Sequence, residues 1–506
     1  MKRQLAGAAA GLFAATAVPA GAIETPALID TLQHGAFDYF WNEANPANGL
    51  VKDRSTSGSP SSIAAVGFGL SAICIGIDHG WVTREAGRDR VLTTLETFWN
   101  GPQGPQSNGT IGYQGLFYHF LDMTTATRTW SSELSTIDSA LLFAGILHCR
   151  EYFDDAHADE VQIRALADSI CHRANWDWAR NSGVGIRMGW TPESGFGPFG
   201  TWVGYNEAMI MYILALGSPT FPVPASTWFT WTSGYVWSFQ YGQTYVNFPP
   251  LFGHQYSHCW IDFRSIQDIY MRSKGITYFE NSRRATLAQR QYCIANPSGW
   301  VGYGADLWGI TASDDPSGYV AHGAPPPQDE NGTITPTAAA SSIPFAPAEV
   351  IPVLHNLYDN YPLLWGPYGF RDAFNLTVGW WDTDYLGIDQ GPIIIMMENH
   401  LSGSVWSRFM QNGDVQTGLS RAGFLPATAA EENVSPGPGP SLAAPWPNPF
   451  HRTATIRYNI PRESTVSLVL YDVAGRRVRT LAEGVHPAGD HRVTVEGEAL
   501  APGVYY

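Results

Sequence analysis

The sequence predicts an all-α (α/α)6 barrel followed by a small β-sandwich, and two observations lead to this prediction. Strongly apolar helices alternate with amphipathic ones before residue 430, which indicates buried helices enclosed by a covering layer. After residue 430 the composition changes to proline and glycine, and stretches of alternating β-branched residues follow. A chain of 506 residues is long enough for one large domain and one small domain.

The predicted helices fall into two groups. Helices of the first group are mostly apolar and are expected to form the inner ring: Ser62–Ile77, Ser135–Leu147, Asn206–Leu216, Pro344–Leu357 and Pro392–Met397. Helices of the second group carry a charged face and are expected to form the outer ring: Thr83–Trp99, Ala158–Trp178 and Ile276–Ala295. Because inner helices pack along most of their length, we expect polar groups at their ends and in the loops before them.

The N-terminus has the features of a secretory signal peptide. Lys2 and Arg3 supply positive charge, an apolar stretch runs from Leu5 to Val18, and small residues lead up to a cleavage site after Ala22. No other stretch is long and apolar enough to span a bilayer. The expected organisation is a signal peptide at 1–22, a catalytic domain at 23–428, a Pro/Gly linker at 429–445 and a β-domain at 446–506.

Charge and composition limit the possible partners. The formal net charge of −16 argues against nucleic acid and against an anionic membrane surface. Charged residues make up only 15% of the chain, whereas aromatic residues make up 13% and include 19 tryptophans. This balance fits either a neutral, ring-shaped ligand such as a sugar or simply a large buried core. The five cysteines lack metal-ligand spacing and permit one disulfide rather than a disulfide scaffold. We expect a monomer.

Four loops that precede predicted inner helices combine aromatic residues with carboxylates. Aromatic faces stack on sugar rings, and glycosidic hydrolysis needs two carboxyl groups, one of them a protonated acid. These loops contribute the candidate site residues His119, Asp122, Trp130, Glu133 and Asp138; Trp190, Trp202, Tyr205 and Glu207; His254, Tyr256, Trp260, Asp262 and Arg264; and Asp382, Asp389 and Gln390.

Several of these residues also have a purely structural interpretation. Ser135 and Asp138 fit a capping box, and Glu207 in a first helical turn suits the helix dipole. Asp389 precedes a Gly-Pro helix start and can act as a cap, while Asp262 and Arg264 fit a structural ion pair. The recurrence of the pattern in four separate loops favours the functional interpretation.

Other chemistries are not supported. The chain has no HExxH motif, no P-loop and no GxSxG elbow. Asp314-Asp315 fits either a cation site or a polar loop that contacts substrate, and we interpret it as the loop. We therefore predict no metal and no cofactor.

The C-terminal part resembles the FlgD-like, Ig-like module of secreted bacterial proteins, some of which serve as type IX secretion sorting domains. Strands are predicted at Ala454–Ile460, Thr465–Asp472 and His491–Val495. The resemblance rests on "PWPNPF", "VSLVLYDVAGRRVRTL", "PAGDHRVTVEG" and "LAPGVYY". Since the family carries a further strand, the module is expected to be truncated, with one sheet edge unpaired. The resemblance implies a possible interaction with secretion machinery.

The larger part resembles the glycoamylase-like family, which includes bacterial endo-β-1,2-glucanases. The motifs are "GLFYHFLDMTTATRTWSSELSTIDSALLFAGIL", "GYNEAMIMYILALGSPT", "FGHQYSHCWIDFRSIQD", "WGITASDDPSGY", which brings in Trp308, and "DYLGIDQGPIIIMMENH". The resemblance implies an (α/α)6 barrel and an inverting, metal-free, glucan-cleaving enzyme. It favours Glu207 as general acid and places Glu133 and Asp138 at or near the cleaved bond, with Asp122 beside them. One of these three would orient the attacking water.

Three functional hypotheses follow. The first is a bacterial endo-acting hydrolase of β-glucan, with β-1,2 linkages favoured, that is secreted or lies in the periplasm or on the cell surface. The second is an α-glucan hydrolase of the glucoamylase type. The third is a non-catalytic glycan-binding protein, although carboxylates such as Glu207 and Glu133 are less needed by a pure binder than aromatic residues.

Overall fold

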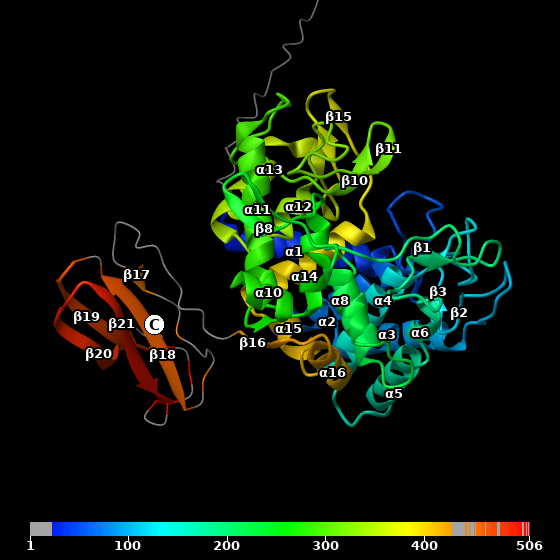
Figure 1. The fold of residues 1–506 in the computed structure, drawn as a ribbon. Coiled ribbons are helices and arrows are strands. Elements are labelled where there is room, and N and C mark those ends of the chain that lie inside the picture. Colours follow the sequence, from blue (N-terminus) through cyan, green and yellow to red (C-terminus); the bar gives the residue numbers. More distant parts are fainter. Residues whose placement is uncertain are drawn as a thin grey trace, which may run out of the picture. The chain divides into compact units, whose positions relative to one another are not determined.

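The computed structural model of the protein describes residues 23–427 and, towards the C-terminus, residues 441–442, 445, 450, 452–460, 462–472, 476–497, 500–501, 503 and 505. The predicted signal peptide and most of the predicted linker lie outside the described residues. The chain divides into two compact units, Met1–Ala427 and Thr428–Tyr506. Helices dominate the first unit, and the second is built from strands (Figure 1).

The helices of the first unit occur in the following order along the chain. Their bounds are α1 Thr25–Asn42, α2 Ile63–Asp78, α3 Arg84–Asn100, α4 Thr136–Tyr152, α5 Ala158–His172, α6 Trp176–Ala179, α7 Met209–Gly217, α8 Ser226–Thr232, α9 Tyr256–Trp260, α10 Ile269–Lys274, α11 Tyr278–Ala295, α12 Pro336–Ala340, α13 Pro347–Asn360, α14 Gly387–Leu401, α15 Ser404–Phe409 and α16 Gly413–Arg421, with 3₁₀ turns at Leu251–His254 and Pro362–Leu364. None of the helices in the described part of the chain has the length and apolarity needed to cross a bilayer.

Short antiparallel ladders connect the loops of this unit. The pairs are β1 Ser61–Ser62 with β4 Phe120–Leu121, β2 Gly112–Tyr113 with β3 Leu116–Phe117, β5 Leu134–Ser135 with β6 Gly189–Trp190, β7 Trp237–Gln240 with β8 Gln243–Val246, β9 Ile266–Gln267 with β16 Leu425–Pro426, β10 Ala312–Asp315 with β11 Gly318–Ala321, β12 Trp365–Gly366 with β13 Gly369–Phe370, and β14 Phe374–Asn375 with β15 Trp380–Trp381. Two of these ladders, β1–β4 and β5–β6, lie immediately before α2 and α4 and hold the loops in which polar residues are predicted to gather.

Helices α2, α4, α7, α9, α12 and α14 form a closed series of neighbours, which we call the inner circuit. Helix α2 packs against α4 and α14, α4 packs against α7, and α14 packs against α9 and α12. The Ser257 hydroxyl of α9 donates to the Glu207 carbonyl just before α7, and the Gln255 amide donates to Ala338 of α12. These bonds close the circuit between α7, α9 and α12.

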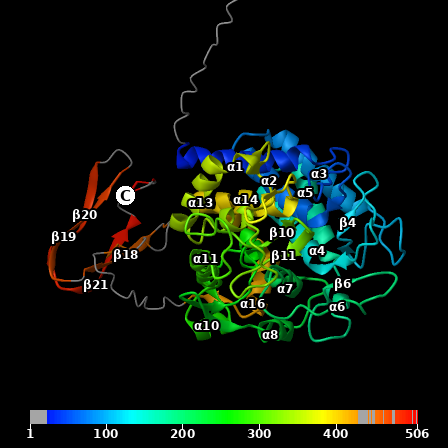
Figure 2. The same cartoon turned by 90° about the horizontal axis from the view of Figure 1, so that it is seen from above.

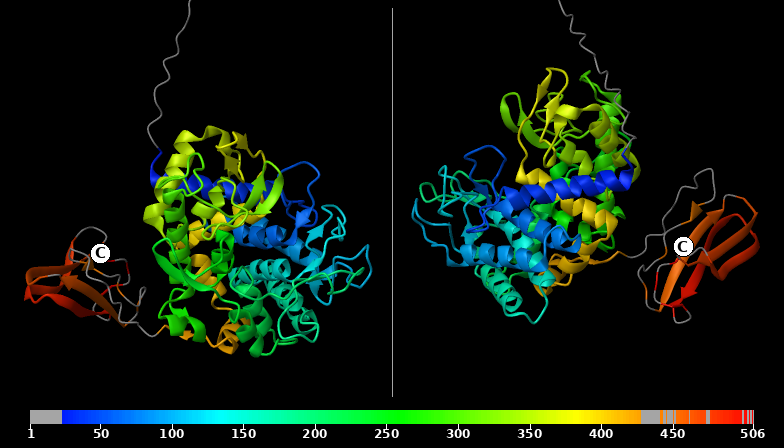
Figure 3. Two further views of the ribbon diagram at one scale, coloured as in Figure 1. Left: turned by 45° about the horizontal axis from the view of Figure 1, so that its top comes forward. Right: turned by 180° about the vertical axis from the view of Figure 1, so that it is seen from behind.

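Among the described residues, five further helices cover the inner circuit. Helix α1 packs against α2 and α14, α3 against α2, α5 against α4, α13 against α12 and α16 against α7. Figure 2 shows α1 and α13 along the edge of the unit, with α14 and α4 nearer its centre. The right view of Figure 3 shows α1 lying across α14. The first unit is therefore a two-layered helical structure.

Glycines allow the inner helices to approach closely. A Cβ atom on Gly145 of α4 would lie 2.0 Å from the Gly67 carbonyl oxygen of α2, and one on Gly67 would lie 2.3 Å from the Leu141 carbonyl oxygen. Both distances are far shorter than a van der Waals contact, so the two backbones touch with no room for a side chain. This contact explains the glycines in two helices that are otherwise strongly apolar.

Two helical predictions need correction. Helix α13 occupies the predicted inner stretch Pro344–Leu357, but it lies outside α12 and buries only one face, through Val350, Val353, Leu354 and Leu357. The inner positions there belong to α9 and α12, which are too short to give a helical periodicity. Helix α14 begins at Gly387 rather than at Pro392, so Asp389 lies in its first turn.

The second unit contains two antiparallel sheets. One sheet has the order β17 Ser441–Leu442, β18 Thr453–Ile460, β21 Gly489–Glu496, and the other pairs β19 Ser464–Tyr471 with β20 Arg477–His486. Three strands occupy the stretches where strands are predicted, and β17 and β20 lie where none is predicted. A small core forms around Ile456, Leu470 and Val495.

The close contact of α2 and α4 predicts that adding one methyl group at Gly145 strongly destabilises the fold. Gly145→Ala forces the Gly67 backbone to move, so we expect the free energy of unfolding to fall by about 1–3 kcal/mol or more. Denaturant titration measures this loss. Gly413→Ala at the start of α16 is the matched control, because nothing lies within 4 Å of a Cβ there, and it should stay within about 1 kcal/mol of wild type. Equal stability of the two variants would contradict the close contact.

Candidate active site

A cavity of about 560 Å³ opens where the N-terminal ends of five inner-circuit helices meet. Ser62 precedes α2, Asp138 lies in the first turn of α4, Glu207 precedes α7, Tyr256 begins α9 and Ile388 lies in α14. The volume falls in the range of ordinary ligand sites. The wall is formed by Asp53, Arg54, Ser62, His119, Phe120, Trp130, Glu133, Ser135, Ile137, Asp138, Leu141, Met188, Phe199, Trp202, Glu207, Phe252, Tyr256, Tyr319, Leu386 and Ile388.

Burial makes Glu207 an unusually weak acid at the cavity wall. Its Oε2 atom is buried and has no hydrogen-bond partner among the described residues. Burial raises the pKa of Glu207 to about 7, and the negative charge of Asp138 adds to this effect, although the residue's own backbone N–H opposes it. A substantial fraction of Glu207 is therefore protonated at neutral pH and able to donate a proton.

His119 lies between two other carboxylates of the cavity. Its Nδ1 is 2.9 Å from Glu133 Oε1, and its Nε2 is 3.7 Å from Asp138 Oδ2. Burial alone would lower the pKa of His119, but Asp138 and the hydrogen bond to Glu133 outweigh it and raise the pKa to about 9. The imidazolium in turn outweighs the effect of burial on Glu133 and lowers the pKa of that carboxyl. The site thus combines a protonated carboxyl with an ionised one, the arrangement that acid–base chemistry requires.

Asp138 lies in the capped first turn of α4 and faces the cavity. Its backbone N–H donates to the Ser135 hydroxyl, which donates in turn to the Asp138 carboxylate. Half of the predicted capping box is therefore present: Ser135 caps the Asp138 N–H, and its hydroxyl holds the Asp138 carboxylate in place at the cavity.

Two aromatic residues, Phe120 and Trp130, form an aromatic rim of the same cavity. The Trp130 side chain is 66% exposed, and its ring centroid lies 5.2 Å from that of Phe120, which stacks on His119 at 3.9 Å. Trp130 and Ser131 both have left-handed backbone conformations, with φ of 55° and 52°. The buried Arg128 guanidinium bonds the Ser131 and Ser132 carbonyls and forms a two-pronged ion pair with Glu193.

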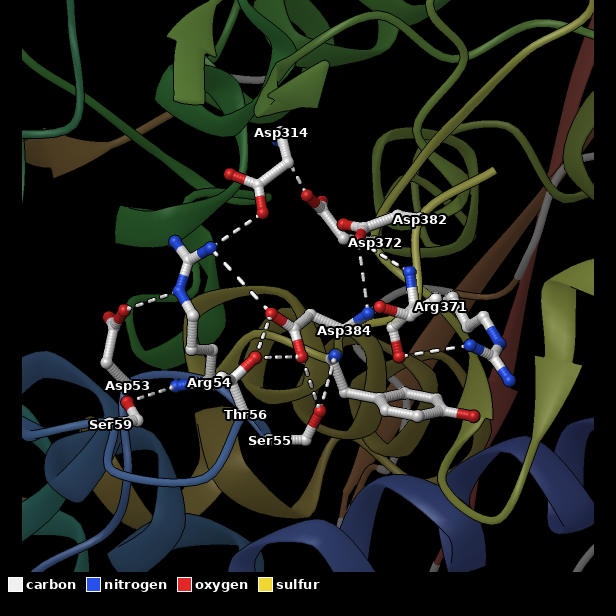
Figure 4. A network of polar contacts seen from close by, with 12 residues as sticks. Asp53, Arg54, Ser55, Thr56, Ser59, Asp314, Arg371, Asp372, Asp382 and Asp384 are labelled. Carbon is white, nitrogen blue, oxygen red and sulfur yellow. Dashed lines mark hydrogen bonds and ion pairs between the residues drawn. The ribbon is translucent and has the colours of Figure 1, made fainter. Parts of the chain in front are cut away.

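Arg54, together with Asp53, forms another part of the cavity wall. Its guanidinium bonds Asp53 and Asp314, and its Nη1 lies 3.9 Å from Asp384 (Figure 4). Sequence reasoning missed Asp53 and Arg54, although their loop precedes an inner helix as the four recognised loops do. It also missed Phe252 and Tyr319.

Comparison with known proteins shows which family this chain belongs to. A family profile described as "Putative glucoamylase" matches residues 200–413. A solved Bacteroides uniformis protein, also named a "putative glucoamylase", is 35% identical, with a TM-score of 0.74 over 80% of this chain and 98% of its own. This chain belongs to the glycoamylase-like family.

This member of the glycoamylase-like family is also similar to proteins named for their action on β-1,2-glucan or its oligosaccharides. An endo-β-1,2-glucanase from Chitinophaga pinensis, solved with sophorotriose and glucose, is 31% identical, with a TM-score of 0.73 over 80% of this chain and 99% of its own. An exo β-1,2-glucooligosaccharide sophorohydrolase from Parabacteroides distasonis is 32% identical over 429 residues; the match spans 78% of this chain and 57% of that relative. An endo-β-1,2-glucanase of Talaromyces funiculosus, at 11% identity and a TM-score of 0.57, shares the fold.

Seven of the residues singled out from the sequence meet at the cavity of this family member. They are His119, Trp130, Glu133, Asp138, Trp202, Glu207 and Tyr256. They come from three of the four recognised loops, each of which leads into an inner-circuit helix.

The remaining candidates lie away from the described cavity wall. Asp122 accepts bonds from Thr124 and Thr125 in an exposed turn, and these bonds lower its pKa. Asp262 and Arg264 form an ion pair with each other, as their structural interpretation predicts. The others pack in the core, take part in loop contacts or lie behind Arg54: Trp190, Tyr205, His254, Trp260, Trp308, Asp382, Asp389 and Gln390.

The raised pKa of Glu207 predicts a pH-dependent stability difference. Between its ordinary pKa of 4.5 and about 7, the folded protein keeps a proton that the unfolded chain has lost, so stability falls as the pH rises. Relative to Glu207→Gln, the unfolding free energy of wild type should fall across this window by up to about 3 kcal/mol, as measured by denaturant titration.

Glu193 provides the control for this measurement. Hydrogen bonds from Arg128 lower the pKa of Glu193 to about 2, so its contribution is complete above pH 5 and is lost only towards strong acid. The difference between wild type and Glu193→Gln should therefore be constant above that pH. A constant difference for Glu207→Gln as well would show that the pKa of Glu207 is not raised.

Proposed function

We propose that this glycoamylase-like protein is a glycoside hydrolase that cleaves β-1,2-glucan in an endo fashion, with Glu207 as general acid. The observation that carries the proposal is the protonated Glu207 carboxyl facing the same cavity as the ionised Glu133. The Chitinophaga relative, which is named for this activity and matches over nearly its whole length, supports the substrate and the endo mode.

Each step of the proposed reaction has a residue available in the cavity. Glu207 gives its proton to the glycosidic oxygen as the bond from that oxygen to the anomeric carbon breaks. A water molecule attacks the anomeric carbon from the opposite face, so the configuration inverts. Glu133 or Asp138 orients this water and takes its proton, while His119 holds both carboxylates through its charge. Trp130 and Trp202 supply faces for sugar rings.

The proposal extends to the fold and to the location of the protein. We infer that the inner circuit is the inner ring of an (α/α)6 barrel, since its helices form a closed series and longer helices cover it. We also infer that the protein is secreted and that its β-domain, as an Ig-like module, contacts secretion machinery. The charge and apolar pattern of residues 1–22 and the C-terminal motifs support this inference.

A panel of linkage-defined glucans tests the substrate. We expect new reducing ends from β-1,2-glucan as a mixture of oligosaccharide sizes, with the opposite anomer formed first, as product chromatography and NMR would show. The description of the family as glucoamylase makes starch the necessary comparison. Release of glucose from starch alone would favour an α-glucan hydrolase, and a single product size would indicate exo cleavage.

The assignment of Glu207 as general acid predicts that replacing this residue lowers the hydrolytic activity. Glu207→Gln removes the donated proton and should lower kcat on β-1,2-glucan by about 10²–10⁴-fold. The wild-type rate should decline as the pH rises above about 7, since Glu207 is then deprotonated. Glu280→Gln, on α11 beside Arg284, is the matched control and should keep full activity. A folded Glu207→Gln variant with wild-type activity would refute the assignment, and wild-type binding without any hydrolysis would favour a glycan-binding protein.

A further inference from the structure

Three carboxylates converge behind the Arg54 wall from separate parts of the chain. Asp314 lies in β10, Asp372 follows β13 and Asp382 follows β15. Each provides one oxygen atom, and these oxygens all lie within 4.8 Å of one another. Figure 4 shows the carboxylates of Asp372 and Asp382 side by side, with Asp314 beyond them. We call these three residues the carboxylate cluster.

The spacing of the oxygens matches that of ligands around one calcium ion. Calcium binds carboxylate oxygens at about 2.3–2.6 Å, so two oxygens on one ion are at most about 5 Å apart. The carboxylate cluster satisfies this limit for every pair. Carboxylates are also the ligand type that hard divalent cations prefer.

Two members of the cluster are buried carboxyl groups. Asp372 is 2% exposed and Asp382 is 9% exposed. Asp372 Oδ2 accepts from the Asp314 backbone N–H, and Asp382 Oδ1 accepts from two backbone N–H groups. Asp382 Oδ2 has no hydrogen-bond donor among the described residues, and the only side chain paired with the Asp372 carboxyl is another carboxyl, that of Asp389. A buried carboxylate oxygen without a partner is costly, and adjacent carboxylates repel each other, so these groups require protons or a cation.

The surroundings provide little positive charge. Arg54 pairs with Asp53, Asp314 and Asp384, which are three carboxylates for one guanidinium. Within the described residues, no ion pair reaches Asp372, Asp382 or the neighbouring Asp389. This part of the molecule therefore has an excess of negative charge that protons or a cation must balance.

We propose that Asp314, Asp372 and Asp382 bind a divalent cation of the calcium type. The ion would fasten β10 to the segments after β13 and β15, in addition to the existing bond from the Asp314 N–H to Asp372. The hairpin β10–β11 carries Tyr319 to the cavity wall, and Asp314 holds Arg54 there. The bound ion would thus fix one wall of the cavity and stabilise the fold without taking part in the chemistry.

Calorimetric titration of calcium chloride into the chelator-treated full-length chain tests the proposal. We expect one saturable site with a Kd between about 10⁻⁷ and 10⁻³ M. The unfolding temperature at saturating calcium should exceed that in EDTA by at least about 2 °C. No heat of binding and no shift at calcium concentrations up to about 10 mM would overturn the proposal.

Variants of the carboxylate cluster test whether calcium binds at these residues. Asp382→Asn keeps the size of the side chain and should weaken calcium binding at least tenfold, with loss of the calcium-dependent temperature shift. Asp359→Asn, at an exposed position of α13, is the matched control and should bind as wild type. Unchanged affinity in Asp382→Asn would overturn the assignment, and Asp314→Asn is the second variant if Asp382→Asn does not fold. Glu207→Gln should bind calcium normally, so the outcome is independent of the proposed hydrolysis.

Discussion

Gly67 and Gly145 allow α2 and α4 to pack backbone against backbone, and the geometry of the cavity depends on this contact. Inner helices that close together leave no space for polar side chains along their length. Such side chains are therefore confined to the helix ends. The N-termini of α2, α4, α7, α9 and α14 reach the same cavity, and each brings the loop before it. The position of the carboxylates is thus a consequence of how the apolar parts of the helices pack.

The same arrangement gives the carboxylates different protonation states. Helix N-termini carry partial positive charge and favour carboxylates near them. For Glu207 this influence is outweighed by burial and by the charge of Asp138, which keep a substantial fraction of the side chain protonated at neutral pH. Glu133 is paired with the His119 imidazolium and loses its proton easily. Two carboxyl groups of almost equal intrinsic acidity are therefore separated by their environments alone.

Much of the site was predictable because the start of a buried helix can be recognised in the local sequence, as the point where an apolar stretch begins. Glu207, Glu133 and Asp138 stand at or before the start of apolar stretches, and the structure brings them together at the cavity. Asp53 and Arg54 likewise stand before an inner helix, α2. Their loop contains no aromatic residue, so it does not show the combination of aromatic residues and carboxylates that marked the other loops.

Tyr319 and Phe252 reach the cavity through contacts between segments far apart in the chain, for which the sequence has no local signal. Aromatic residues were the least reliable guide, because an indole suits a core as well as a sugar. Trp260, for example, donates to Ser71 inside the core. The inner helices α9 and α12 were too short to be recognised by periodicity.

The backbone at Trp130 and Ser131 has a consequence for ligand capture. Two successive non-glycine residues in left-handed conformations cost about 1–3 kcal/mol each, which the bonds from Arg128 to the neighbouring carbonyls offset. The loop consequently has one favoured shape before any ligand arrives. An incoming ring meets an indole that is already presented, so association gives up little further freedom of the loop and the rim works as a preformed template.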